Sequence, residues 1–246
     1  MATKLTIDEG NSSVKIALWR DDVMVQEVTC RHANLNDMAQ VVAPWGHIDA
    51  AIYCSVCRHE RSQLLDFMHL YADRAIILDA HTPMPITLGY RTPNTLGADR
   101  IAAAVGATVV APKRTALVVD MGTAITYDVV TAEGEYLGGN IAPGIFVRLE
   151  ALNHFTQALP LIETDGDCPR WGYDTTTAMR AGAIRGVVGE LQYYRHCLRT
   201  DSHSATVVLT GGSADLIMPY ISTPTIYEPN LVLIGLNRIL NYNENN

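Results

Sequence analysis

The sequence of 246 residues has no run of about 18 consecutive apolar residues, the length that a membrane-spanning helix needs. It also has no excess of basic residues, because 18 Lys and Arg against 26 Asp and Glu give a formal net charge of −8. Neither a membrane nor a nucleic acid is therefore expected as a partner. A nucleotide or an acidic substrate would need local help from backbone N–H groups, a cation or an arginine.

Cysteines are few and irregularly spaced. There are five, an odd number without a pattern, which is typical of a reducing compartment and not of a disulfide framework. The CxxC from Cys54 to Cys57 has no partner pair, which favours structural or incidental thiols over a metal or redox site. The N-terminus passes directly into an apolar strand containing Asp8, unlike a cleavable signal peptide, and we expect a cytoplasmic protein.

The composition and the apolar spacing indicate a compact α/β protein. Hydrophobic residues make up 48% and charged residues 18% of the chain, which argues against disorder. Alternating and helical patterns predict strands at 5–18 (a hairpin), 23–30, 49–56, 75–78, 116–130, 135–137 and 205–209. The helices expected between them are at 35–42, 62–71, 101–110, 145–152 and 174–198, with a short one ending at Tyr220. Residues 138–144 are interpreted as a glycine-rich turn and 241–246 as a frayed end.

The first expected hairpin, residues 5–18, has a polar turn that can bind phosphate. Gly10 can take a positive φ if the turn needs one, and Asn11 tolerates it. The hydroxyls of Ser12 and Ser13 add donors to the backbone N–H groups. An ordinary hairpin turn is the alternative that this segment alone leaves open.

Residues 116–130 repeat the plan of the first hairpin: an apolar strand, Asp120-x-Gly122, a small polar turn and a second apolar strand. Because the same hairpin pattern recurs about one hundred residues later, we expect two related halves, 1–113 and 114–246, each a sheet with helices. Chance similarity of two hairpins is the alternative. A third turn, residues 210–212, has two glycines between a strand and a helix, where a flat ring or a phosphate can approach the backbone.

In this order the three turns resemble the phosphate 1, phosphate 2 and adenosine motifs of the actin, sugar kinase and Hsp70 superfamily. That resemblance implies two duplicated ribonuclease H-like domains, each a mixed sheet flanked by helices, with ATP in an interdomain cleft. A long loop rich in proline and glycine, residues 81–99, precedes a strong helix and is expected to be functional.

The segments around these turns look like type III pantothenate kinase. The matching runs are Gly89-Tyr90-x-x-Pro93, Leu96-Gly97-Ala98-Asp99-Arg100, residues 120–126, residues 138–144, Leu159-Pro160 and Gly172-x-x-Thr175-x-x-Ala178. The resemblance covers nearly the whole chain. It implies ATP-dependent phosphorylation of pantothenate to 4'-phosphopantothenate, the first step of coenzyme A biosynthesis, by a homodimer. A face formed by Gly182, Gly186 and Gly189 is one candidate for packing between subunits. Another small-molecule kinase of the superfamily and a non-catalytic regulatory relative are the alternatives.

The resemblance also implies roles for individual residues. Asp99 is expected to be the general base, and the substrate-binding residues are Tyr90, Gly97, Ala98, Asp99, Arg100 and Thr175. The arginine offers a planar fork for the carboxylate of pantothenate. The cofactor-binding residues are Asp8, Glu9, Gly10, Asn11, Ser12, Ser13, Val14, Lys15 and Thr123.

Two kinds of cation are expected. Asp8 is suited to orient hydrated Mg²⁺ beside the phosphates of ATP, because that ion prefers one or two carboxylates plus phosphate oxygens and water. Asp120 matches the residue that binds a monovalent cation, K⁺ or NH₄⁺. Three residues depart from the family pattern: Glu9 adds negative charge beside the phosphate turn, Ser12 replaces a threonine, and Asp174 replaces an asparagine.

Overall fold

The computed structural model describes residues 2–31, 34–57, 61–201 and 205–244, and its contacts divide the chain into two compact units. Unit 1 comprises Met1–Pro112, Glu133–Leu137 and Asn230–Asn246, and unit 2 comprises Lys113–Ala132 and Gly138–Pro229. These units are defined by contacts and not by common ancestry. The expected division into two related halves, 1–113 and 114–246, therefore stays a prediction. Within the described part of the chain, every helix is too short or too polar to span a bilayer.

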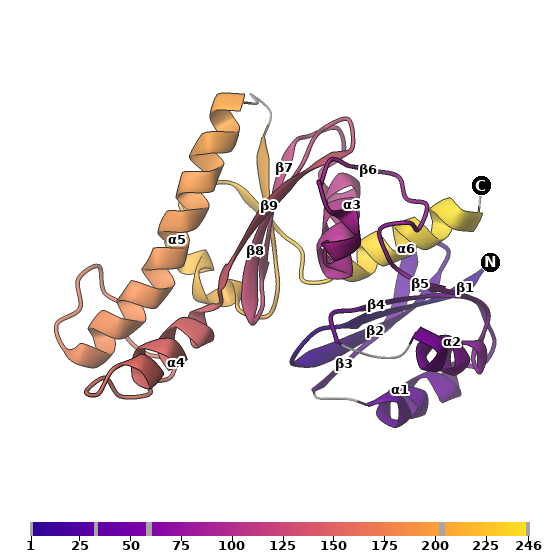
Figure 1. Ribbon diagram of the computed structural model, residues 1–246, viewed down its shortest axis with the longest axis horizontal. Helices are drawn as coiled ribbons and strands as arrows, with labels where there is room; N and C mark the ends of the chain where they lie inside the picture. The colour runs from indigo at the N-terminus through magenta and orange to yellow at the C-terminus, as the bar shows by residue number, and fades with distance from the viewer. Residues whose placement is uncertain (1, 32–33, 58–60, 202–204, 245–246) are drawn as a thin grey trace. The chain divides into compact units, whose positions relative to one another are not determined.

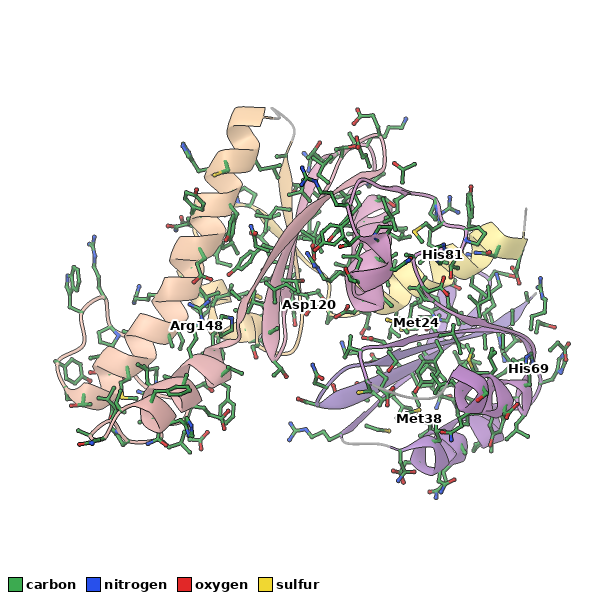
Figure 2. All side chains as sticks on the ribbon, viewed as in Figure 1. Met24, Met38, His69, His81, Asp120 and Arg148 are labelled. Atoms are coloured by element: carbon green, nitrogen blue, oxygen red, sulfur yellow. The ribbon has the colours of Figure 1, made fainter. Side chains whose placement is uncertain are left out.

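Unit 1 is built on a mixed five-stranded sheet in the order β3-β2-β1-β4-β5 (Figure 1). Its strands are β1 (Thr3–Glu9), β2 (Ser13–Arg20), β3 (Val23–Arg31), β4 (Ile48–Ser55) and β5 (Ala72–Ile77). Strands β1 to β3 are antiparallel, and β4 and β5 run parallel to β1. Helices α1 (Leu35–Val42) and α2 (Arg61–His69) cover one face, where Met38 is fully buried in the core (Figure 2).

The other face of this sheet carries α6 (Leu231–Glu244), which packs against α3 (Ala98–Val110). The two helix backbones touch, because a Cβ on Gly106 or Gly235 would overlap backbone atoms of the opposite helix. At the end of α6, Glu244 pairs with Lys4 at 2.7 Å. The expectation of a frayed end is therefore wrong for residues 241–244, while 245–246 lie outside the described residues.

Unit 2 is built on a second sheet, whose strands follow the order β11-β10-β7-β8-β9 and which β6 extends by pairing with the first residues of β9. The strands of this sheet are β6 (Thr87–Leu88), β7 (Ala116–Met121), β8 (Ala124–Val130), β9 (Glu135–Pro143), β10 (Thr206–Thr210) and β11 (Thr225–Tyr227). Strand β6 and the first three residues of β9 belong to unit 1, and the rest of the sheet belongs to unit 2. Helices α4 (Ile145–Phe155) and α5 (Thr175–Asp201) cover one face (Figure 1). Short 3₁₀ turns are at Ala43–Trp45, Pro93–Thr95, Ala214–Leu216 and Met218–Tyr220.

The glycine-rich segment 138–144 is mostly strand and not the expected turn. Strand β9 continues to Pro143, and a Cβ on Gly139 would overlap the carbonyl oxygen of Tyr127 on β8. Glycine is present there because the neighbouring strand comes close, a reason that a sequence pattern does not distinguish from a turn. The short helix expected before Tyr220 consists of two 3₁₀ turns.

A partly buried ion pair joins the helices of unit 2 to their sheet. Arg148 on α4 donates two hydrogen bonds of 2.8 Å to the carboxylate of Glu190 on α5 (Figure 2). Tyr127 on β8 donates a third, at 3.0 Å. Burial opposes the charge of Glu190, but the hydrogen bonds from Arg148 and Tyr127 hold its pKa below the usual value. Burial, helped by the charge of Glu190, raises the pKa of Tyr127.

Candidate functional site

The phosphate turn predicted in unit 1 is a tight hairpin turn between β1 and β2. The backbone N–H of Gly10 donates to the carbonyl of Ser13 at 2.9 Å, and the side chains of Asn11 and Ser12 are exposed. Neither Gly10 nor Asn11 has a positive φ, so the turn does not use the freedom that we expected of them. The exposed backbone and hydroxyl donors are compatible with a phosphate ligand.

The two acidic residues before this turn point to opposite faces of the sheet. Asp8 lies directly across from Lys15 on β2, and both side chains are half-buried on the same face. Glu9 is 5% exposed on the other face, where its carboxylate accepts a 2.5 Å hydrogen bond from the Ser55 hydroxyl. Burial and the negative charge of Glu9 raise the pKa of Tyr53 on the same face. The extra charge of Glu9 is thus held away from the face that carries Asp8.

Four of the expected substrate-binding residues, Gly97 to Arg100, lie together at the start of α3. Gly97 is the N-cap, and Asp99 and Arg100 lie in the first turn. The Arg100 side chain is 95% buried, and its guanidinium carbon lies 5.9 Å from the ring centre of Tyr90. Asp99 Oδ1 accepts a 2.9 Å hydrogen bond from the backbone N–H of Arg100. A cation, an aromatic ring and a carboxylate therefore meet at one helix N-terminus, where the helix dipole also favours an anion.

Gly97 is needed for this arrangement, because a Cβ at this position would overlap the carboxylate of Asp99. Its backbone φ of −59° is ordinary, so the requirement is one of space and not of conformation.

A pocket of about 430 Å³ opens beside the same helix N-terminus within unit 1. It lies at the carboxyl ends of the parallel strands β4 and β5, the edge at which open α/β sheets bind ligands. Its volume suits a small organic molecule. Its lining includes Ser55, Asp79, His81, Asn94, Gly97 and Ala98.

Sequence reasoning named only Gly97 and Ala98 among these lining residues. Ser55 could have been found as the polar residue that ends a buried strand. His81 and Asn94 belong to the loop that we expected to be functional, but no local pattern distinguishes them from its other polar residues.

In unit 2, two of the three nucleotide turns are neighbours. Asp120, at the end of β7, is half-buried and lies beside Thr210 on β10 (Figure 2). The backbone N–H of Ser213 donates to the carbonyl of Met121 at 3.0 Å, which fixes the second turn against the first. Gly211 has φ +91°, and a Cβ on it would lie 2.5 Å from Asp120 Oδ1. Only glycine therefore leaves the space beside the Asp120 carboxylate open.

Thr123 follows in the exposed turn between β7 and β8. Its carbonyl accepts a 2.9 Å hydrogen bond from the backbone N–H of Gly144, the N-cap of α4. In register, Asp120 faces Thr126 as Asp8 faces Lys15, so the two hairpins place an aspartate at equivalent positions.

Thr175 is the first residue of α5, and its side chain is exposed. Asp174 caps this helix by accepting hydrogen bonds of 2.8 Å from both the backbone N–H and the hydroxyl of Thr177. These two bonds lower the pKa of Asp174. Asp174, one of the three departures from the family pattern, therefore acts as the cap of α5.

A family profile described as type III pantothenate kinase matches residues 4–196. The type III pantothenate kinase of Porphyromonas gingivalis (strain ATCC BAA-308 / W83) is 40% identical over 248 residues, covering 99% of this chain and 100% of the relative.

Two solved structures are similar in fold. One is a conserved Baf family protein from Campylobacter jejuni, with a TM-score of 0.63, 23% identity and coverage of 98% of this chain and 100% of that chain. The other is MreB 5 of Spiroplasma citri bound to AMPPNP, with a TM-score of 0.53, 10% identity and coverage of 100% and 98%. The two mixed sheets flanked by helices thus match the domains of actin-like ATPases, as the sequence predicted.

Proposed function

Since this chain belongs to the type III pantothenate kinase family, which phosphorylates pantothenate with ATP in coenzyme A biosynthesis, we propose that the first turn of α3 carries out its catalytic step. Family membership decides for a pantothenate kinase over the two alternatives, another small-molecule kinase and a non-catalytic relative. The observation that carries the proposal is the buried Arg100 side chain, whose guanidinium lies beside Tyr90 and whose backbone N–H donates to the carboxylate of Asp99.

Asp99 is the proposed general base. Phosphoryl transfer has a loose transition state, so positioning and charge stabilisation do most of the work. A carboxylate in the first turn of a helix is held in place, and it can accept the proton of the pantothenate hydroxyl as that hydroxyl attacks the γ-phosphate.

Asp99→Asn keeps the shape and loses the base, so kcat should fall by about 10²–10⁴-fold while pantothenate still binds. The assay couples pantothenate-dependent ADP release to a spectroscopic signal, and calorimetry measures binding. Asp66→Asn, an exposed change on α2, is the matched control and should leave kcat unchanged. A near-normal kcat for Asp99→Asn would exclude this residue as the base.

Arg100 is the proposed partner of the pantothenate carboxylate, with Tyr90 and Thr175 as further substrate contacts. A buried guanidinium has less water to displace and so binds an anion more strongly than an exposed one. The pocket at Gly97 and Ala98 is the proposed place for pantothenate within unit 1. Arg100→Lys keeps the charge but loses the bidentate geometry, and should raise KM more than it lowers kcat.

The phosphate turn, residues 8–15, and Thr123 are the proposed nucleotide contacts. The half-buried carboxylate of Asp8 fits hydrated Mg²⁺, which would neutralise charge on the phosphates when bound. Lys15 lies on the same face and can add to that neutralisation.

Asp120 is the proposed ligand of a monovalent cation. The open space that Gly211 leaves beside its carboxylate fits such an ion. A cation there would offset negative charge near the phosphates. Activity is expected to require K⁺ or NH₄⁺, and Asp120→Asn should lose that response. Equal activity of the wild-type protein in K⁺ and in a large organic cation would contradict the proposal.

A homodimer is the proposed assembly, and unit 2 offers an apolar surface for it. Phe155 on α4 is 81% exposed and Trp171, between α4 and α5, is 82% exposed. Because both side chains are large, apolar and exposed, they are candidates for the contact between subunits. On α5, Gly182 and Gly189 have nothing within 4 Å of an added Cβ, so the helix surface at these two glycines is open to another chain, whereas Arg148 Nη1 lies 3.7 Å from an added Cβ on Gly186.

Sedimentation velocity should show a dimer for the wild-type protein and a monomer for the double variant Phe155→Ser, Trp171→Ser. Leu70→Ser, a change at an exposed residue of unit 1, is the control and should leave the dimer intact. A dimer that survives the double variant would place the interface elsewhere.

A further inference from the structure

Three side chains with metal-binding atoms meet in unit 1, at the amino end of the parallel strands β4 and β5. His47 precedes β4, Asp49 is its second residue, and Asp73 is the second residue of β5. Ile48 pairs with Ala72 in register, so the two aspartates lie directly opposite each other on neighbouring strands. Like charges in this position destabilise a sheet unless a cation lies between them.

The two distances from His47 in this cluster match those between neighbouring ligands of a metal ion. His47 Nε2 lies 3.5 Å from Asp49 Oδ1 and 3.4 Å from Asp73 Oδ2. Charge-assisted hydrogen bonds are shorter, about 2.7–2.9 Å. By contrast, ligands at about 2.0–2.2 Å from a tetrahedral Zn²⁺ lie about 3.3–3.6 Å from each other. All three donor atoms lie within 4.8 Å of one another, close enough to share one ion.

The rest of the cluster fits an ion of this kind. The second carboxylate oxygen of Asp49 accepts a 2.6 Å hydrogen bond from the backbone N–H of Thr3 on β1. Such a bond orients a metal ligand and leaves the other oxygen for the ion. The side chains of His47 and Asp73 are 69% and 67% exposed, so an ion can enter from solvent and keep water as a further ligand.

We propose that His47, Asp49 and Asp73 form a binding site for a divalent transition-metal ion of the Zn²⁺ type, with water completing a tetrahedral shell. One imidazole and two carboxylates suit Zn²⁺ better than Mg²⁺, which prefers oxygen ligands alone. The ion bridges β4 and β5 and neutralises the two facing aspartates, so its effect is on the stability of unit 1.

This site is separate from the kinase machinery. Asp49 and Ser55 are six positions apart along β4, and at about 3.3 Å per residue this places the cluster about 20 Å from the pocket end of the strand. Failure of this proposal would therefore leave the proposed roles of Asp8, Asp99 and Asp120 untouched.

The test is Zn²⁺ binding to the purified full-length protein after chelator treatment, measured by competition with a chromogenic chelator. The wild-type protein should bind one Zn²⁺ per chain at this site, and His47→Ala and Asp73→Asn should bind it at least about tenfold more weakly. His69→Ala, an exposed histidine on α2, is the matched control and should bind like the wild type (Figure 2). The kinase activity of His47→Ala should equal that of the wild type.

Co²⁺ substitution provides a second measurement that reports on geometry. The wild-type protein should show the strong visible absorption of four-coordinate Co²⁺, and both cluster variants should lose it. Zn²⁺ should also raise the Tm of the wild type and not that of His47→Ala. Binding that is equal in the wild type and His47→Ala, or a wild type that takes up no Zn²⁺, would mean that the cluster is an ion pair only and would overturn the proposal.

Discussion

Replacing Gly211 by alanine should disturb the proposed cation site through one added methyl group. The residue has φ +91°, a conformation that costs an L-residue about 1–2 kcal/mol. The new Cβ would also lie 2.5 Å from Asp120 Oδ1, and overpacking of this kind costs about 1–3 kcal/mol. The sum is about 3 kcal/mol, which must appear as lower stability, as a displaced Asp120, or as both.

Gly212→Ala is the matched control, because it adds the same methyl group at the neighbouring residue, where no atom lies within 4 Å of the new Cβ. For Gly211→Ala, about 3 kcal/mol corresponds to a loss of about 100-fold in kcat/KM for ATP if the strain displaces Asp120. If the turn keeps its geometry and Asp120 is not displaced, the strain should instead lower Tm by about 6–12 °C.

The assay is coupled ADP release as a function of K⁺ concentration, together with thermal unfolding of both variants. Gly212→Ala should keep the wild-type Tm and the wild-type dependence on K⁺ concentration, and only its KM for ATP is expected to change, because Gly212 lies in the turn that resembles the adenosine motif. The reasoning is refuted if Gly211→Ala keeps the wild-type Tm and the wild-type response to K⁺, or if the two variants behave alike.

Two further predictions concern stability. Gly235→Ala should destabilise the protein by about 2 kcal/mol in urea unfolding, because its Cβ would overlap the Ala102 carbonyl and this outweighs a gain of about 1 kcal/mol in helix propensity. Gly189→Ala, in open space, should be neutral or stabilising, and an equal loss in both would contradict the reasoning. Arg148→Ala should cost about 1 kcal/mol at pH 7, since it removes the bidentate bond to Glu190. The pKa of Glu190 is lowered in the folded state, so this difference should be complete above the ordinary pKa of a glutamate and should be lost as the pH falls through the lowered pKa of the folded state. A difference that persists in strong acid would indicate lost packing instead.

Much of the fold was predictable from local patterns. The hairpin around Asp8, its repeat around Asp120 and the helix at residues 35–42 are where alternation and helical spacing put them. These patterns work because a half-buried strand or helix must show its period in the sequence. The expected helix start at Ile101 was three residues late, since α3 begins at Ala98.

Other features depend on partners that are distant in the sequence. The part of β9 beyond Leu137 was interpreted as a turn. Gly139 is needed there because β8 lies close to it, but in the sequence this glycine cannot be distinguished from one in a turn. The direction of Glu9 was also undetermined, since its charge is held by Ser55, 46 residues away. The cluster of His47, Asp49 and Asp73 requires the register of β4 against β5, which no local window contains.

The sequence by itself determined the family and the α/β class, because the family motifs are short runs of residues at the ends of strands, and their order along the chain can be identified without a structure. It also named the residues proposed for catalysis, from Asp8 to Thr175. Only the tertiary structure decided that the Arg100 side chain is buried against Tyr90, that the turn of Gly211 adjoins Asp120, and that Glu9 points away from Asp8. Burial and proximity are properties of packing between segments that are far apart in the chain, and a linear pattern records neither.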